Sequence, residues 1–131
     1  MPVNDPIADF LTRLRNAAMI SKPEVALPFT RILAEMAALL AREGFVESVD
    51  TRGRGTQKEL VIKMRYINGD PAIESLRRVS TPGRRIYRQA KNIRTVRSGF
   101  GMSIISTPKG LMTDKEAKKE NVGGEILCEL W

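Results

Sequence analysis

Apolar positions in the first third of the chain recur at helical spacing. Between residues 7 and 18 the apolar side chains stand three or four positions apart, which predicts a helix with one apolar face. Asp5 can cap this helix, and Pro6 suits its first position. A second helix with the same spacing is predicted to begin after a Thr30 cap and to end at Gly44.

Short runs with the composition of strands surround the second helix. We expect strands at 25–27, 45–49 and 60–64, with the last two joined by a hairpin at 51–57 that is rich in glycine and arginine. This half therefore predicts the order α-β-α-β-β, with both helices on one face of a small sheet.

The tract 66–71, Tyr-Ile-Asn-Gly-Asp-Pro, carries the best linker signals in the chain. We therefore predict an N-terminal α/β domain at 1–66, a linker at 67–71 and a second domain at 72–131.

The second half predicts mostly antiparallel β structure with one or two short helices. Strands are expected at 73–79, 86–88, 102–107 and 125–131. Short helices are expected at 92–97 and, after a capping box, at 113–121. Tight turns are expected at Pro82-Gly83, of the type that needs glycine in its third position, and at Thr107–Gly110. The whole chain is thus expected to be α+β with two small subdomains.

Charge changes this picture, because it is unevenly distributed. The 131 residues carry a net charge of +7, yet residues 75–112 hold nine basic side chains and no acidic one. The remainder holds thirteen basic and fifteen acidic residues. A solvated face is the plain alternative, but soluble surfaces usually intersperse both signs, so a polyanionic partner is the better explanation.

Several classes of function lack the residues that they need. The chain has no histidine and a single cysteine, Cys128, so an internal disulfide, a cysteine-based zinc site and the commonest general base are excluded. No apolar run approaches the length of a membrane span, and the opening residues predict no secretory signal. We expect no metal, no cofactor, no small-molecule substrate and no membrane partner.

Two motifs resemble catalytic or phosphate-binding motifs, but each lacks residues that such a motif requires. Gly99-Phe100-Gly101 lacks the third glycine of a dinucleotide fingerprint and the Gly-Lys-Ser/Thr ending of a phosphate loop. Ser106 with Lys109 lacks an orienting third group for a serine–lysine dyad. The chain is therefore predicted not to be an enzyme.

Basic, aromatic and hydroxyl side chains gather in the second half and suit RNA. Tyr87, which can stack on a base or a ribose, stands among Arg84, Arg85 and Arg88. A half-buried strand position is an equally plain explanation for Tyr87. The turn at 106–110 offers two hydroxyls, a lysine and a glycine that suit the shallow minor groove of RNA.

Four segments carry a family resemblance, in order and over essentially the whole chain. They are DPIADFLTRLRNA at 5–17, RVSTPGRRIY at 78–87, GFGMSIISTPKGLMTD at 99–114 and GGEILC at 123–128. Together they resemble the bacterial family of small-subunit ribosomal protein eight.

The resemblance implies a two-domain α+β structural constituent of the ribosome, located in the cytoplasm. It implies binding to the central domain of 16S ribosomal RNA early in assembly of the small subunit, beside ribosomal proteins five and twelve. Some relatives also repress translation of their own messenger RNA. The implied RNA-binding residues of the second domain are Ser106, Thr107, Lys109, Gly110, Tyr87 and Glu125.

The resemblance also implies contacts from the first domain to the RNA backbone, through Arg13, Arg15 and Asn16, for which a solvated helix face is the alternative. Many relatives carry serine where this chain has Pro108, which offers neither a hydroxyl nor an amide donor but fixes the backbone of the loop. A general RNA- or DNA-binding module outside the ribosome is the main rival, although the basic residues do not lie on a single recognition helix.

Overall fold

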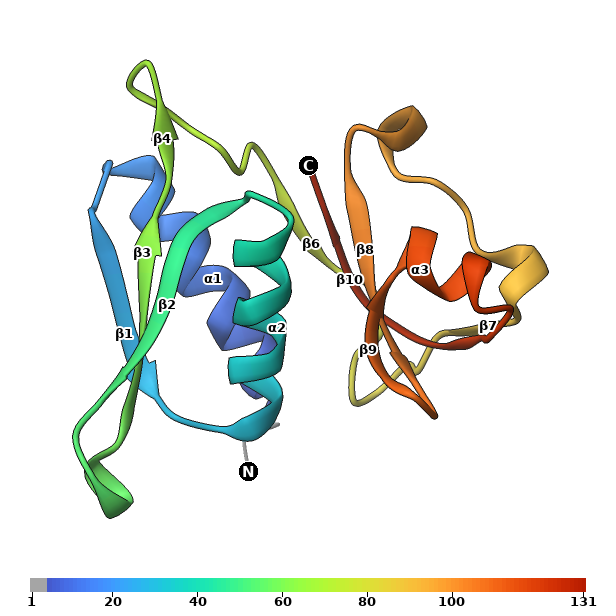
Figure 1. Ribbon diagram of the computed structural model, residues 1–131, viewed down its shortest axis with the longest axis horizontal. Coiled ribbons are helices and arrows are strands. Elements are labelled where there is room, and N and C mark those ends of the chain that lie inside the picture. Colours follow the sequence, from blue (N-terminus) through green and yellow to red (C-terminus); the bar gives the residue numbers. More distant parts are fainter. Residues whose placement is uncertain (1–4) are drawn as a thin grey trace. The chain divides into compact units, whose positions relative to one another are not determined.

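The computed structural model describes residues 5–131; residues 1–4, which open the predicted first domain, lie outside the described part. The chain forms two compact units, of which one is Pro6–Glu74 and the other contains Asp5 and Ser75–Trp131 (Figure 1). Helices and antiparallel sheets occur in both units, which confirms the predicted α+β class. The domain limits drawn from the sequence, at 66 and 72, stay a prediction.

The first unit is a three-stranded sheet with two helices. Its elements are α1 (Pro6–Met19), β1 (Glu24–Pro28), α2 (Arg31–Arg42), β2 (Val46–Arg52) and β3 (Glu59–Met64). The strand order is β1-β3-β2, with antiparallel pairing throughout, and a short 3₁₀ turn at Gly55–Gln57 lies between β2 and β3.

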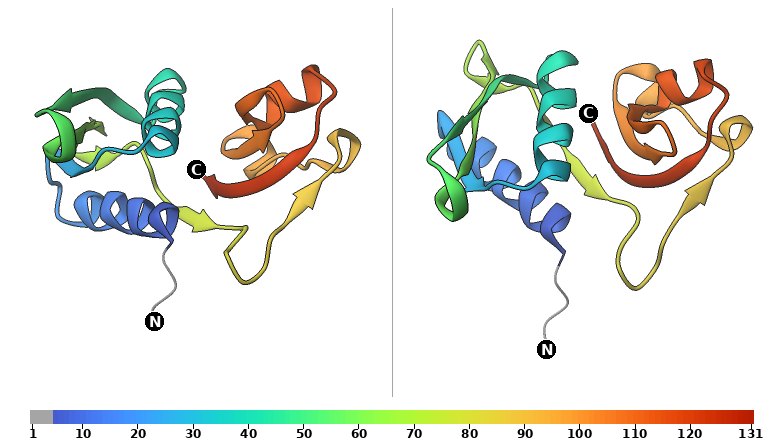
Figure 2. Two further views of the ribbon diagram at one scale, coloured as in Figure 1. Left: turned by 90° about the horizontal axis from the view of Figure 1, so that it is seen from below. Right: turned by 60° about the horizontal axis from the view of Figure 1, so that its bottom comes forward.

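One face of this sheet is buried by the helices. Val25 lies opposite Ile62 and Leu27 opposite Leu60, so these four buried side chains share a face. The alternating positions of β1 and β3 are exposed or half-buried. Both views in Figure 2 show α1 and α2 beside this sheet. The apolar faces that the sequence predicted for the helices therefore build one core with one face of the sheet.

The ends of α2 follow the predicted capping chemistry. The Thr30 hydroxyl accepts a hydrogen bond from the Leu33 amide at 3.3 Å. At the other end Gly44 has φ +83°, and the Phe45 amide donates to the Leu40 carbonyl at 2.8 Å. These contacts satisfy backbone groups that a helix leaves without partners, with glycine in the left-handed conformation that it adopts most easily.

The tract that carries the linker signals forms a small hairpin. Strands β4 (Tyr66–Ile67) and β5 (Asp70–Pro71) pair across Asn68 and Gly69, whose φ angles are +54° and +86°. Asn-Gly is the preferred pair for such a two-residue turn. The same residues that signal a flexible joint also encode a tight hairpin, and here the hairpin forms.

The second unit is built on one antiparallel sheet. Its strands are β6 (Leu76–Arg78), β7 (Tyr87–Arg88), β8 (Met102–Thr107), β9 (Gly110–Thr113) and β10 (Gly124–Leu130). The order is β6-β10-β8-β9, and β7 also pairs with β10. The strand predicted at 73–79 is confirmed only at 76–78, and β9 was not predicted.

Helix α3 (Asp114–Lys119) has the predicted capping box. The Thr113 hydroxyl accepts from the Glu116 amide, and the Glu116 carboxylate accepts from the Thr113 amide, each at 3.2 Å. Ala117 of this helix packs on Ile105 and Ile126 of the sheet. The helix ends at Lys119, short of the predicted residue 121.

Two local predictions in this unit are wrong. The helix expected at 92–97 is absent: 3₁₀ turns at Ala90–Asn92 and Arg97–Gly99 flank an extended stretch that buries Ile93 and Val96. Burial of these two β-branched side chains outweighs the weak helical preference of the segment. The turn at 81–84 exists and is closed by two backbone hydrogen bonds, but Gly83 does not have the positive φ of the predicted turn type.

Candidate nucleic-acid interface

Three of the predicted RNA-binding side chains stand in one row across the second unit's sheet. Glu125 of β10 lies directly opposite Tyr87 of β7 on one side and Ser106 of β8 on the other. Directly opposed residues of antiparallel strands project from the same face. Residues 38 positions apart in the chain, from Tyr87 to Glu125, are thus brought together by strand pairing; we call Tyr87, Glu125 and Ser106 the polar row.

Two glycines allow the strands of the polar row to approach closely. A Cβ at Gly124 would lie 2.1 Å from the Ser106 carbonyl oxygen, and one at Gly123 would lie 2.3 Å from the Arg88 carbonyl oxygen. No side chain fits at such distances, so both positions require glycine. The sequence marks these two glycines only as part of the segment 123–128 that carries the family resemblance.

The turn at 107–110 uses its hydroxyl to shape itself. The Thr107 hydroxyl donates to the Gly110 carbonyl at 2.7 Å and accepts from the Lys109 amide at 3.1 Å. Thr107 is 9% exposed, whereas Pro108, Lys109 and Gly110 are exposed. Gly110 has φ +110°, which favours glycine. The tip of the turn is therefore at the surface, whereas the Thr107 hydroxyl forms hydrogen bonds within the turn. A direct contact from Thr107 to RNA stays a prediction.

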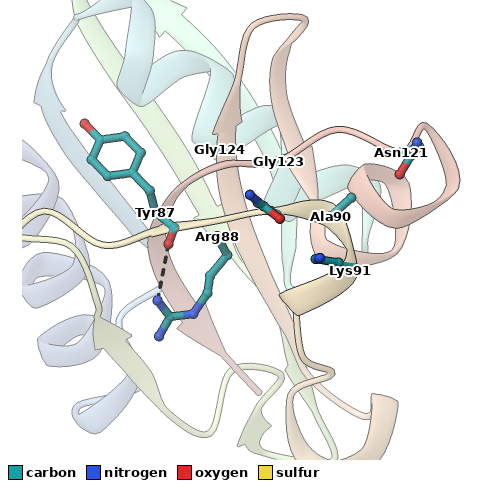
Figure 3. A pocket seen from close by; sticks show the side chains of 8 residues that line it. Tyr87, Arg88, Ala90, Lys91, Asn121, Gly123 and Gly124 are labelled. Atoms are coloured by element: carbon teal, nitrogen blue, oxygen red, sulfur yellow. Dashed lines mark hydrogen bonds between the residues drawn. The ribbon is translucent and has the colours of Figure 1, made fainter.

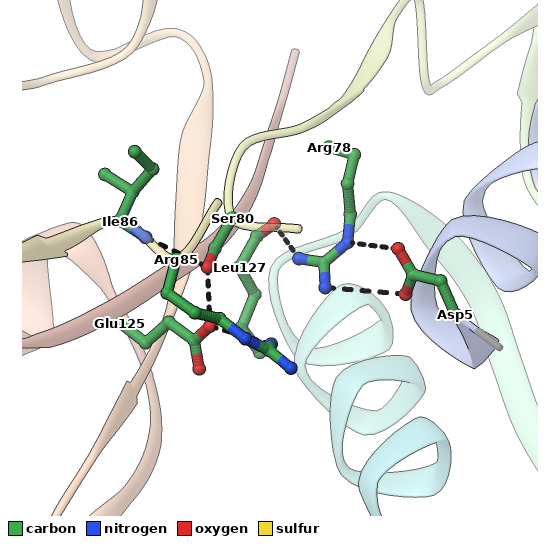
Figure 4. Close-up of polar contacts among 7 residues, drawn as sticks. All are labelled: Asp5, Arg78, Ser80, Arg85, Ile86, Glu125 and Leu127. Carbon is green, nitrogen blue, oxygen red and sulfur yellow. Dashed lines mark hydrogen bonds and ion pairs between the residues drawn. The ribbon is translucent and has the colours of Figure 1, made fainter. Parts of the chain in front are cut away.

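The Glu125 carboxylate is held in place from two sides (Figure 4). It accepts hydrogen bonds from the Ser80 hydroxyl and, at 3.0 Å, from the Arg85 guanidinium. Ser80 is fully buried, and its oxygen also accepts from the Ile86 amide at 3.1 Å. Ser80 thus links the carboxylate of the polar row to the segment that leads into Tyr87. Sequence reasoning did not identify Ser80, since only its position before a turn distinguished it.

Residues 75–112 contain no acidic side chain, but folding brings acidic side chains from other parts of the chain next to some of their basic ones. Four of the nine basic side chains of this segment are paired with acids from elsewhere in the chain: Arg77 with Glu129, Arg78 with Asp5, Arg85 with Glu125 and Lys109 with Glu120. The other five are exposed and have no carboxylate partner within residues 5–131: Arg97, whose guanidinium stacks on Trp131, and then Arg84, Arg88, Lys91 and Arg94. These ion pairs reduce the positive excess of the segment but do not cancel it. We call Arg84, Arg88, Lys91 and Arg94 the unpaired cations.

Arg78 has a structural part in this unit. Its guanidinium contacts both Asp5 carboxylate oxygens, at 3.3 and 3.5 Å, and donates to the Leu127 carbonyl (Figure 4). Leu127 lies where the register between β10 and β8 shifts. The Leu127 carbonyl also accepts from the Val79 amide at 3.1 Å, so the half-buried arginine is a second donor to it and links this irregular place in the sheet to Asp5.

A surface depression adjoins the polar row (Figure 3). Tyr87, Arg88, Lys91, Asn121 and Gly124 are among the residues that line it. The Tyr87 side chain is 63% exposed, and the Arg88 guanidinium donates to the Tyr87 carbonyl at 3.2 Å. An aromatic ring, two cations, an amide and accessible glycine backbone suit a nucleotide, with its base, ribose and phosphate.

The predicted contacts of the first domain lie on α1. Arg13, Arg15 and Asn16 are exposed there. The Arg13 guanidinium is 3.0 Å from the Asp9 carboxylate and 3.3 Å from the Ala26 carbonyl oxygen, so part of its charge is already engaged. Their role in binding RNA stays a prediction.

Other kinds of site find little support in the described part of the chain. No group of three potential metal ligands occurs among residues 5–131, and no helix there is long and apolar enough to cross a membrane. Cys128 is buried, and burial raises the pKa of its thiol to about 12. The thiol therefore stays protonated near neutral pH and is a poor nucleophile.

Known proteins resemble the chain over its full length. Residues 5–131 match the model of a family described as Ribosomal protein S8. A protein of Rubrobacter xylanophilus is 48% identical over 129 residues, 98% of each chain, and one of Rippkaea orientalis is 46% identical over 133 residues, all of both chains. One of Burkholderia cenocepacia is 45% identical over 128 residues, again 98% of each. All three are named small ribosomal subunit protein uS8, a name that describes a ribosomal constituent and not an enzyme. The chain belongs to the ribosomal protein S8 family.

Proposed function

We propose that the chain binds the central domain of 16S ribosomal RNA directly and early in assembly of the small subunit. Its family membership makes it a structural constituent of that subunit in the cytoplasmic ribosome. The family also implies ribosomal RNA and other ribosomal proteins as partners. The RNA region, the residues in contact and the stage of assembly are the proposal.

The observation that carries the proposal is the polar row in a unit that also carries the unpaired cations. Tyr87 offers a ring for stacking, Ser106 a hydroxyl, and Glu125 a fixed acceptor for a 2′-hydroxyl or a base amino group. The unpaired cations supply attraction to phosphates that does not depend on sequence. The row is rigid because its strands are paired and its carboxylate is held, so little ordering is needed on binding.

A salt titration tests the electrostatic part. If the four unpaired cations neutralise about four phosphates, affinity falls by roughly two orders of magnitude between 50 and 200 mM salt. The measurement is filter binding of a 16S central-domain fragment. An affinity that hardly depends on salt would contradict the proposed phosphate contacts.

A pair of substitutions tests the assignment of roles. Thr107→Ala removes the hydroxyl that shapes the turn, and we expect it to weaken binding of the cognate fragment more than binding of random RNA. Arg94→Ala removes an unpaired cation and is expected to weaken both alike. Equal losses on both RNAs for Thr107→Ala would remove the turn from specific recognition.

The rival is a general nucleic-acid-binding module. Competition of structured RNA, duplex DNA and the central-domain fragment for the chain separates the two. Preference for the fragment supports the proposal, and equal competition by duplex DNA supports the rival.

Two finer proposals rest on the family resemblance. Ribosomal proteins five and twelve are proposed as neighbours, to be checked by crosslinking in the intact small subunit. Repression of its own messenger RNA is proposed if a transcript presents the same folded shape to the polar row. Failure of every upstream transcript to bind would end the second idea.

A further inference from the structure

A second exposed aromatic lies at the other end of β8 from the polar row. Phe100 is 87% exposed, the largest fraction among the exposed large apolar side chains of residues 5–131. It lies between the 3₁₀ turn Arg97–Gly99 and β8, in the loop that precedes this strand. The six residues of β8, Met102–Thr107, span about 16 Å, so this loop and the turn at Thr107 are separate places on the surface.

The loop that carries Phe100 is held in an unusual conformation. Arg97 and Ser98 have φ of +50° and +55°, and Gly99 has φ +95°. Two successive left-handed residues other than glycine are unfavourable and persist only where their surroundings enforce them. The loop sequence by itself would not hold this shape.

Local contacts supply that enforcement. The Val96 carbonyl accepts from the amides of Gly99 and Gly101 at 3.0 and 3.1 Å. A Cβ at Gly101 would lie 2.5 Å from the Leu130 carbonyl oxygen, so the chain is pressed against β10 directly after Phe100. The ring is therefore presented by a fixed loop.

Two cations without acidic partners belong to this loop or contact it. The Arg97 guanidinium stacks on Trp131, 4.3 Å from the ring centroid, and the Lys115 ammonium lies 3.5 Å from the Gly99 carbonyl oxygen. Neither forms an ion pair within the described residues. The nearby Asp114 is 1% exposed and accepts from the Ser103 amide, so it is turned inward.

We infer that Phe100, Arg97 and Lys115 form a second RNA contact, in which an unpaired base stacks on the Phe100 ring and adjacent phosphates bind the two cations. An exposed ring beside free positive charge has the chemistry of single-stranded RNA recognition. A protein partner would need a wider apolar patch, whereas this unit exposes only Phe100 and Tyr87 as large apolar side chains within the described range. The inference takes its ligand class from the proposed function but uses different residues.

Photocrosslinking in the whole subunit tests the inference. Photoreactive benzoylphenylalanine replaces Phe100 in one protein and Tyr87 in another, and each is reconstituted into small subunits from ribosomal RNA and purified proteins. We expect an adduct at position 100 that ribonuclease removes. An adduct at position 100 with a protein, or none, would overturn the inference.

The label at position 87 separates the two proposals. An RNA adduct at 87 without one at 100 leaves the proposed function standing and rejects the second contact. An adduct at 100 alone supports the second contact and rejects the assignment of Tyr87.

An affinity measurement supplies an independent test. Phe100→Ala should lower affinity for the ribosomal RNA about tenfold, as expected for loss of one stacked base. Phe100→Trp should retain affinity, because it keeps an aromatic face. Ile67→Ala, at an apolar residue of the first unit that is 50% exposed, is the control and should have no effect. Equal affinities of the alanine variant and the unchanged protein would overturn the inference.

Discussion

The two units of the chain differ in the ion pairing of their exposed arginines. In the first unit, most of the exposed arginines have carboxylate neighbours, although Arg54 has none among the described residues: Arg13 pairs with Asp9, Arg31 with Glu35, Arg42 with Glu43, and Arg52 with Glu24 and Glu59. In the second unit, Arg84, Arg88 and Arg94 have no such partner among the described residues. Exposed ion pairs add little stability. Their main effect here is on availability: the first unit presents a balanced surface, and the second keeps charge for a polyanion.

The largest effect is expected where packing, rather than charge, builds the site. Gly124→Ala would place a methyl group 2.1 Å from the Ser106 carbonyl oxygen, so β8 and β10 must separate or the unit must unfold. We expect a loss of about 3 kcal/mol or more in the free energy of unfolding, measured by urea denaturation.

Gly83→Ala is the control for this substitution. Nothing lies within 4 Å of a Cβ at Gly83, and its φ is not positive, so the change should be nearly neutral. Wild-type stability of the Gly124→Ala protein would mean that the strands of the polar row are not so closely paired.

Two matched triple substitutions test whether the unpaired arginines of the second unit bind RNA more strongly than the paired arginines of the first unit. Alanine at Arg84, Arg88 and Arg94 should lower the slope of log affinity against log salt by about 3. Alanine at Arg31, Arg42 and Arg52 should leave the slope nearly unchanged, because those charges are already engaged. Similar slopes for both variants, measured by filter binding to the central-domain fragment, would reject the comparison.

Ser80→Ala sharpens the comparison by changing recognition without removing a charge. The Glu125 carboxylate loses one of its two donors, and the Ile86 amide loses its acceptor. We expect about tenfold weaker binding to the cognate RNA, corresponding to one lost hydrogen bond to a charged group. Binding to random RNA should hardly change.

A double-mutant cycle with Glu125→Gln shows whether Ser80 acts through that carboxylate. The two effects on affinity should then be less than additive. Ser103→Ala, at another buried serine of the same sheet, should leave affinity unchanged. Fully additive losses would show that Ser80 acts elsewhere.

The smallest effect is expected at the turn. Glu120→Gln removes the partner of Lys109, whose ammonium lies 3.5 Å from the Glu120 carboxylate. Because this pair is exposed, the gain in RNA affinity should be only about two- to threefold at low salt. The gain should vanish at high salt, and its persistence there would point to a change in the turn itself.

Local sequence signals predicted an element correctly where the residues concerned favour only one local structure. Thr30, Gly44 and the Thr113–Glu116 box mark helix ends correctly, because capping involves only residues within one helical turn. The segment at 92–97 was misjudged, and the tract at 66–71 forms a hairpin that the linker signals did not reveal. Asn-Gly serves both joints and hairpins, and Ile93 and Val96 are placed by the core that they enter.

The candidate site was predicted in its residue types but not in its arrangement. Tyr87, Glu125 and Ser106 were named from the sequence, partly through the family resemblance, and strand pairing sets them in one row. Ser80 could not be found, because its contacts join residues 45 positions apart. The internal use of the Thr107 hydroxyl was likewise invisible, since a threonine at a turn can face either way.

The sequence by itself determined the α+β class, the family and the location of the positive charge, because these depend on composition, periodicity and local motifs. Only the tertiary structure decided which positive charges remain available. Folding brings Glu125 next to Arg85 and Glu120 next to Lys109, whereas Arg88 has no carboxylate neighbour among the described residues. The physical reason is that an ion pair depends on distance in space, and the strands and helix that set those distances come from remote parts of the chain.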